Sequence, residues 1–115
     1  MVADPLREIQ SRFDELRYRQ HALDTLLQKG IDPAIIRQTI LQDDPEVIES
    51  YPDHWIGPAY LVLGWWGERR PLHTLFGIGA ILWLITGYDP SVDPMRRFLP
   101  PDYRDRRPRE EEEHG

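Results

Sequence analysis

The fold is determined by residues 59–88, which read AYLVLGWWGERRPLHTLFGIGAILWLITGY. Three apolar runs, 59–66, 71–77 and 80–88, are separated by short segments that contain glycine. Runs of this length, rich in aromatic and β-branched residues and bounded by turn residues, predict β-strands. Because the links between them are short, the strands are expected to pair as an antiparallel meander.

The sequence before this stretch adds one strand and a set of helices. Residues 46–51, EVIESY, alternate between two sides and predict a fourth strand. Residues 5–16, 21–30 and 33–42 carry apolar side chains at helical spacing, and RYRQ at 17–20 fits either a short strand or a continuation of the first helix. We therefore expect an α+β fold, with N-terminal helices packed on one face of a four-stranded antiparallel sheet.

The ends of the predicted helices are marked by residues that favour helix termini. Asp4-Pro5 and Asp32-Pro33 each combine a preferred N-cap with a proline suited to the first turn. Gly30 is suited to the left-handed conformation that ends many helices. The short link after Gly30 predicts a corner between two helices.

The chain is long enough for one domain with one hydrophobic core. It has 115 residues and no cysteine, so neither a disulfide nor a thiolate site can form. We assign residues 1–16 to an N-terminal helical extension, 17–107 to a single α+β domain and 108–115 to a disordered acidic tail. The four histidines lack metal-ligand spacing and no motif indicates a cofactor, so we expect neither a metal nor a cofactor.

The net charge of −6 is unevenly distributed along the chain. Residues 96–109 contain six arginines and two aspartates, whereas residues 110–115 contain four glutamates. The arginine-rich segment suits phosphate or carboxylate groups, and the acidic end beside it can screen its charge. The first residues lack the apolar core of a signal peptide, and no apolar run is long enough for a membrane helix. We therefore expect a cytoplasmic protein without membrane association.

The turns indicate which side chains share a face of the sheet. A two-residue turn at Ile78-Gly79 and a four-residue turn at 67–70 would place Gly64 opposite His73. The face expected under the helices is then almost wholly apolar and comprises Leu61, Leu63, Trp65, Leu72, Thr74, Phe76, Ile81, Trp83 and Ile85. The second face is mixed and comprises Tyr60, Val62, Gly64, Trp66, His73, Leu75, Leu82, Leu84, Thr86 and Tyr88.

The second face has too many apolar side chains to lie bare in water, so the C-terminal segment, a second copy of the chain or a ligand is expected to cover it. His73, Thr86 and Tyr88 lie near one another in the predicted register, beside a dent left by Gly64. With incoming arginines they could hold a phosphodiester; the alternative is a dimer interface that contains a hydrogen-bonded His73. Other aromatic side chains that suit either the core or base stacking are Tyr51, Trp55, Tyr60, Trp65 and Trp66.

Four pieces of the sequence between His21 and Arg107 resemble an uncharacterised bacterial family, domain of unknown function 4258. In order, they read HALDTLLQKGI, EVIESYPDHWIGPAYLVLGWWGERRPLHTLF, LITGYDP and DYRDRR. The resemblance covers about three quarters of the chain and leaves residues 1–16 outside it. That family is similar to small α+β toxin domains of the RelE/ParE type, so the resemblance implies a RelE/ParE-like fold.

The resemblance also implies an activity directed at RNA, because that wider group of toxins includes ribonucleases. Its implied partners are RNA and an antitoxin-like protein. Where the family often has arginine, this chain has Thr25 and Lys29. The residues that the resemblance implies by position are His21, His73 and Tyr88 for catalysis, and Arg104, Arg106 and Arg107 for substrate binding.

Three classes of function therefore remain open. The first is a toxin-like, metal-independent endoribonuclease, or a decayed relative of one, in which histidine moves protons and arginine holds phosphate. The second is a non-enzymatic, homodimeric protein-interaction module that uses the second face. The third is a small-ligand pocket around His73. The negative net charge argues against tight, non-specific binding of nucleic acid.

Overall fold

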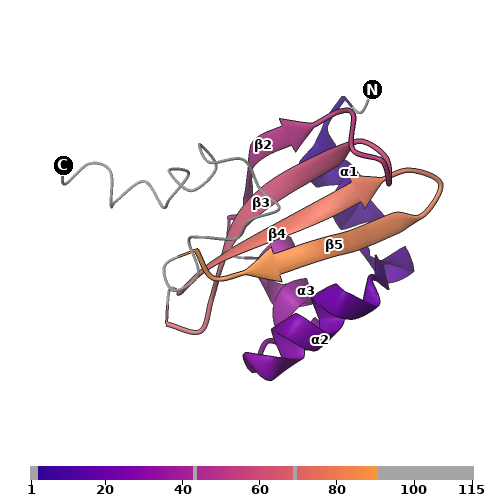
Figure 1. Ribbon diagram of the computed structural model, residues 1–115. Coiled ribbons are helices and arrows are strands. Elements are labelled where there is room, and N and C mark those ends of the chain that lie inside the picture. The colour runs from indigo at the N-terminus through magenta and orange to yellow at the C-terminus, as the bar shows by residue number, and fades with distance from the viewer. Residues whose placement is uncertain (1–2, 43, 69, 91–115) are drawn as a thin grey trace.

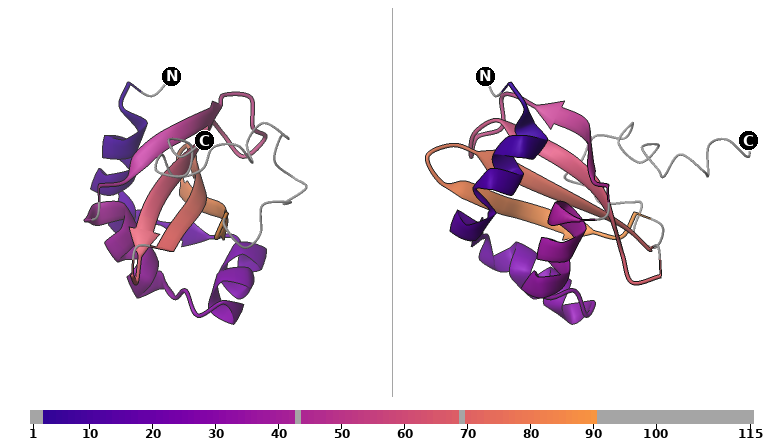
Figure 2. Two further views of the ribbon diagram at one scale, coloured as in Figure 1. Left: turned by 90° about the vertical axis from the view of Figure 1, so that its left-hand side faces the viewer. Right: turned by 180° about the vertical axis from the view of Figure 1, so that it is seen from behind.

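The protein has two layers, a β-sheet and a layer of helices that covers one face of the sheet (Figures 1 and 2). The computed structural model describes residues 3–42, 44–68 and 70–90. This arrangement confirms the α+β class. In chain order the elements are α1 (Pro5–Ser11), the 3₁₀ turn η1 (Phe13–Glu15), β1 (Arg17–Tyr18), α2 (Gln20–Gln28), α3 (Pro33–Leu41), β2 (Glu46–Tyr51), β3 (Ala59–Trp66), β4 (Arg70–Ile78) and β5 (Leu82–Tyr88).

The sheet has five strands in the order β1-β5-β4-β3-β2, so the expectation of four strands is wrong. Strands β2 to β5 form the predicted antiparallel meander. The additional strand β1 pairs parallel to β5, with Arg17 opposite Trp83 and Tyr18 opposite Leu84, which makes the sheet mixed. A strand of two residues carries no periodic pattern, and its partner lies far along the chain, so local sequence signals cannot reveal the pairing.

The helix ends predicted at Asp4, Gly30 and Asp32 are confirmed, but the first helix, expected over residues 5–16, ends at Ser11 and is followed by the 3₁₀ turn η1. The Asp4 carboxylate accepts a hydrogen bond from the Arg7 backbone N–H at 3.2 Å, and Asp32 caps Ile35 in the same way at 3.0 Å. Gly30 has a φ of 79°, the left-handed conformation that allows the chain to turn between α2 and α3. The longest described helices have nine residues. Among the described residues, no helix is long and apolar enough to cross a membrane.

The main hydrophobic core lies between the helices and the sheet. Ile9 of α1 and Phe13 of η1 belong to the same buried cluster as the side chains of α2 and α3. Each large aliphatic side chain buried in this way contributes about 1.5–3 kcal/mol to stability. The cluster also contains Leu26, Ile31, Ile36 and Ile40 from the helical region and Tyr60, Val62, Leu72, Phe76, Ile78, Leu82 and Leu84 from the sheet.

The registers of the hairpins differ from the prediction. Leu63, and not Gly64, lies opposite His73, because β3 and β4 are shifted by one residue relative to the predicted register. Ile78 pairs with Leu82, so the chain turns through residues 79–81 and not at Ile78-Gly79. A register shift also occurs between Leu75 and Phe76. The predicted turn lengths are wrong, and turn length sets the register of a hairpin. A register shift of one residue moves the side chains of a strand to the opposite face of the sheet.

The two faces of the sheet are therefore composed differently from the prediction. Tyr60, Val62 and Trp66 of β3 lie under the helices, whereas Leu61 lies on the second face. Leu82 and Leu84 of β5 likewise pack under the helices. For β4 the prediction is confirmed, with Leu72 and Phe76 under the helices.

The helix layer approaches the sheet closely at two glycines. A Cβ atom at Gly64 would meet the Thr39 side chain of α3 and would lie 3.2 Å from the Thr39 carbonyl oxygen. A Cβ atom at Gly87 would lie 3.1 Å from the Leu26 side chain of α2. Gly64 thus allows α3 to pack on the sheet, and the predicted dent beside His73 is wrong.

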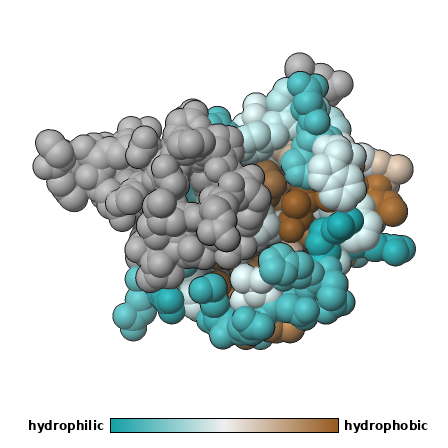
Figure 3. Space-filling model, viewed as in Figure 1, coloured by the Kyte–Doolittle hydropathy of each residue, from teal (hydrophilic) through white to brown (hydrophobic). Residues whose placement is uncertain are grey.

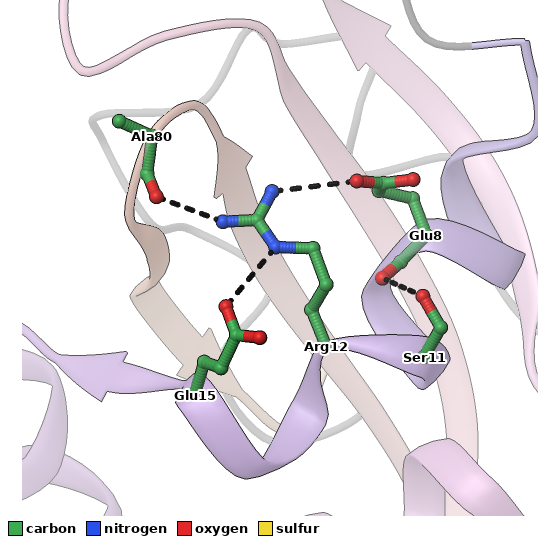
Figure 4. Close-up of polar contacts among 5 residues, drawn as sticks. All are labelled: Glu8, Ser11, Arg12, Glu15 and Ala80. Atoms are coloured by element: carbon green, nitrogen blue, oxygen red, sulfur yellow. Dashed lines mark hydrogen bonds and ion pairs between the residues drawn. The ribbon is translucent and has the colours of Figure 1, made fainter.

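Arg12 connects the N-terminal helical segment to the turn between β4 and β5 (Figure 4). Its Nη2 donates to the Ala80 carbonyl oxygen at 3.0 Å. Its other nitrogens approach Glu8 of α1 at 3.4 Å and Glu15 of η1 at 3.5 Å. Two carboxylates thus hold the guanidinium in position for a contact with a distant part of the chain.

Candidate functional site

The second face of the sheet is the side that the described helices leave uncovered (Figures 1 and 2). Figure 3 looks onto this face and shows hydrophobic residues, in brown, among pale and hydrophilic ones. Its buried polar side chains are His73 and Thr86. Its apolar cluster consists of Ala59, Leu61, Leu75 and Tyr88, with Ile48, Tyr51 and Ile85 packed against it.

His73 and Tyr88 form a close pair on the second face. They lie directly opposite each other in β4 and β5. Their ring centroids are 5.5 Å apart, and the rings meet edge to face at 78°. Each residue is 1% exposed. Thr86 shares the face, because it pairs with Leu75, two residues beyond His73 on β4.

The sequence placed His73, Thr86 and Tyr88 on one face despite the wrong register. The predicted register places Leu84 opposite His73, whereas Tyr88 is the observed partner. This shift is an even number of residues, and an even shift keeps a side chain on the same face of the sheet. Chemically, an imidazole can take or give a proton near neutral pH. A phenol can donate a hydrogen bond or a proton. The pair thus brings together two groups that suit proton transfer.

His21 is separated from this pair by the sheet. It is exposed near the start of α2, whose buried residues Ala22 and Leu26 pack on the helix side. The structure therefore does not bring the two predicted catalytic histidines together. Helical periodicity fixes His21 relative to its own helix but does not show on which side of the sheet that helix lies.

The predicted substrate-binding arginines, Arg104, Arg106 and Arg107, lie outside the described residues, as does the predicted acidic tail at 108–115. The described chain ends at Pro90, two residues after Tyr88. Among residues 3–42, 44–68 and 70–90, no group of three or more histidine, cysteine, aspartate or glutamate side chains could hold a metal ion.

A second polar and aromatic cluster, formed by Arg19, Trp55 and Trp83, lies near the edge strand β1. The Arg19 guanidinium carbon is 5.2 Å from the centre of the Trp55 ring and 5.7 Å from that of Trp83. Trp55 is predicted from the sequence to suit either the core or base stacking, whereas no sequence pattern predicts Arg19 or Trp83 as part of a site. The alternation Arg17-Tyr18-Arg19 is the sequence pattern that could have indicated a cationic site here, because in an extended segment it places both arginines on one side.

His54 helps to position the exposed Trp55. Their rings are stacked, with centroids 6.0 Å apart and planes inclined at 19°. The His54 Nδ1 accepts a hydrogen bond from the Ile56 backbone N–H at 3.2 Å. Burial lowers the pKa of His54 below its usual value, so the neutral imidazole is favoured.

These features define a two-layer α+β domain with a buried histidine–tyrosine pair on the sheet face opposite its helices. Residues 18–89 match the family described as "Domain of unknown function (DUF4258)", and the chain belongs to this family. The match runs from β1 to the residue after β5 and so includes both His73 and Tyr88. No curated protein matches the chain. No solved structure matches it either, so the expected RelE/ParE likeness has no support from these comparisons.

Proposed function

We propose that this protein is a toxin-like, metal-independent endoribonuclease. The observation that supports the proposal is the His73–Tyr88 pair, whose rings are 5.5 Å apart on the second face. Cleavage of RNA without a metal needs a base, an acid and a cation. The pair offers the first two groups, and the arginines at 104, 106 and 107 are the predicted source of the third.

In the proposed reaction the ribose 2′-oxygen attacks the adjacent phosphorus. The proton of the 2′-hydroxyl passes to the His73 imidazole as the new P–O bond forms. The bond from phosphorus to the 5′-oxygen breaks, and the Tyr88 hydroxyl gives a proton to that leaving oxygen. The products are a 2′,3′-cyclic phosphate and a 5′-hydroxyl, and transfer of the proton from His73 to Tyr88 restores the enzyme. Each of the two proton transfers is expected to contribute about 10²-fold or more to the rate.

Burial of the pair places a condition on this mechanism. Both side chains are 1% exposed, so RNA must open the second face before the phosphate reaches them. Such opening is common in enzymes that exclude water from the reacting groups. The Arg19–Trp55–Trp83 cluster lies outside the buried pair, and so does His21, which has no part in the proposed chemistry.

Cleavage of mixed cellular RNA in EDTA tests the proposal. The wild-type protein is expected to cut the RNA, and His73→Ala is expected to abolish cutting. His21→Ala is a matched histidine control, because His21 lies on the helix side and its loss is expected to leave the rate unchanged. Intact RNA with the wild-type protein would refute the proposal, and equal loss in both variants would refute the assigned role of His73.

A homodimeric interaction module is the second candidate. It is favoured by the apolar character of the second face, where Leu61 and Leu75 lie beside Tyr88. In the toxin interpretation the same face would also suit an antitoxin-like protein. Sedimentation equilibrium over a range of concentrations tests the homodimer, since a purely monomeric protein at every concentration would exclude it.

A further inference from the structure

We propose that Arg19, Trp55 and Trp83 form a binding site for single-stranded RNA. The inference rests on the proposed function only in naming RNA as the ligand. Three separate parts of the chain build the site: Arg19 lies between β1 and α2, Trp55 lies in the loop after β2, and Trp83 belongs to β5. The parallel pairing of β1 with β5 places Arg17 opposite Trp83 and extends the site by a second cation.

The exposure of Trp55 is the first observation behind this proposal. Trp55 is 78% exposed, compared with 48% for Leu27 and 41% for Ile81, the other exposed large hydrophobic residues in the described part of the chain. Packing in the core therefore does not account for this indole. The ring is within cation–π distance of Arg19 and stacks on the ring of His54, and these two contacts leave most of the indole exposed.

The charge of the site is the second observation. Among the described residues, neither Arg17 nor Arg19 takes part in an ion pair, whereas Arg12, Arg37 and Arg70 each contact a carboxylate. Arg19 instead lies within cation–π distance of two indole rings. Arg19 beside the exposed indole of Trp55 and Arg17 opposite Trp83 give the site a local positive charge in a chain whose net charge is −6.

Single-stranded RNA combines the two kinds of group that this site can bind. Nucleobases stack on aromatic rings irrespective of sequence, and arginine binds phosphate oxygens through several N–H groups. In a duplex the faces of the bases are already stacked, so an exposed indole has little to bind. The chemistry therefore favours an unpaired strand.

The sheet also places this site in line with the His73–Tyr88 pair. Trp83 lies opposite Gly77, which is on the same face of β4 as His73 and four residues further along. At about 3.3 Å per residue the two sites are about 13 Å apart along the strand. A bound strand that runs along β4 could therefore contact both, so that the cluster anchors RNA while the pair acts on it.

Fluorescence anisotropy with a labelled single-stranded oligonucleotide tests the inference. The probe is 2′-O-methyl RNA, which cannot be cleaved, so binding is measured apart from the proposed activity. Trp55→Ala is expected to weaken binding about tenfold, because stacking on one aromatic ring is lost. Arg19→Ala is expected to reduce the slope of log K against log salt by about 0.7, the value for one phosphate contact of a single strand.

Matched variants on the helix side serve as controls. Leu27→Ala removes another exposed apolar side chain, from α2, and Arg7→Ala removes an exposed cation from α1. Both are expected to bind the probe as the wild type does. Absence of wild-type binding, equal affinity of Trp55→Ala and the wild type, or equally strong competition by duplex RNA would overturn the inference.

The two proposals can fail separately. If the probe binds through Trp55 but cellular RNA stays intact, the binding site stands and the proposed nuclease does not. If cellular RNA is cut but Trp55→Ala binds the probe normally, the nuclease stands and the binding site does not. Urea denaturation of Trp55→Ala provides a check, because unchanged stability excludes unfolding as the cause of weaker binding.

Discussion

Adding a single methyl group at Gly64 is expected to destabilise the protein by pushing α3 away from the sheet. The new Cβ would overlap the Thr39 side chain and press on its carbonyl oxygen, 3.2 Å away. Overpacking of this kind lowers the free energy of unfolding by about 2 kcal/mol. Alanine also restricts the unfolded chain more than glycine does, which raises the free energy of unfolding by about 0.5 kcal/mol. The net loss of about 1.5 kcal/mol corresponds to a fall in Tm of about 6–12 °C. Urea and thermal denaturation followed by circular dichroism measure both quantities.

A second substitution tests whether Thr39 is the cause. Thr39→Ser removes the methyl group that the new Cβ meets but keeps the hydroxyl that donates to the Ile35 carbonyl oxygen at 2.8 Å. The double variant should therefore be more stable than the sum of the single effects predicts, by about 1 kcal/mol. Additive effects would contradict the proposed contact.

Gly79→Ala is the matched control for this experiment. A Cβ atom at Gly79 would have its nearest neighbours at 3.9 Å, an ordinary contact distance. Its unfolding free energy should therefore lie within about 0.5 kcal/mol of the wild-type value. If Gly64→Ala is as stable as this control, the reasoning about the register of β3 and the closeness of α3 is wrong.

Three further predictions concern stability. Asp32→Ala removes the cap of α3 and is expected to cost about 1 kcal/mol in urea denaturation; an unchanged midpoint would contradict the cap. Leu26→Ala leaves a cavity at a fully buried position and is expected to cost about 2–5 kcal/mol in the same assay. The pKa of His54 is lower in the folded state than its usual value of 6.5, so the folded state binds this proton less readily than the unfolded state does. His54 is therefore expected to leave stability unchanged above pH 6.5 and to reduce the free energy of unfolding as the pH falls from 6.5 through the lowered pKa. His54→Gln should remove that part of the pH dependence, and an unchanged profile would exclude this histidine as its source.

Local patterns predicted the elements of the fold but not how distant elements meet. Each of β2 to β5 lies within two residues of its predicted range, because apolar runs between turn residues mark strands directly. The helix caps were also found from Asp4 and Asp32. Local patterns do not decide between a strand and a helix at residues 17–20, because the pairing of β1 with β5 joins segments far apart in the sequence.

The candidate site was predictable to a similar extent. Alternation along β4 and β5 put His73 and Tyr88 on one face, and this holds in the structure because the longer turn and the register shift between Leu75 and Phe76 together move their pairing by an even number of residues. The same reasoning could not place His21, because the side on which α2 packs depends on contacts that span the whole domain. The pairing of Trp55 with Arg19 likewise follows from a loop meeting an edge strand, which no local pattern encodes.

The proposed reaction is tested most directly by the products formed from one labelled RNA oligonucleotide in EDTA. The account predicts a fragment that ends in a 2′,3′-cyclic phosphate and no cleavage where the 2′-hydroxyl is replaced by hydrogen. It also predicts that Tyr88→Phe, which keeps the ring packed against His73, lowers the single-turnover rate about 100-fold. An oligonucleotide left intact by the wild-type protein, or cleaved at the same rate by Tyr88→Phe, would contradict the account.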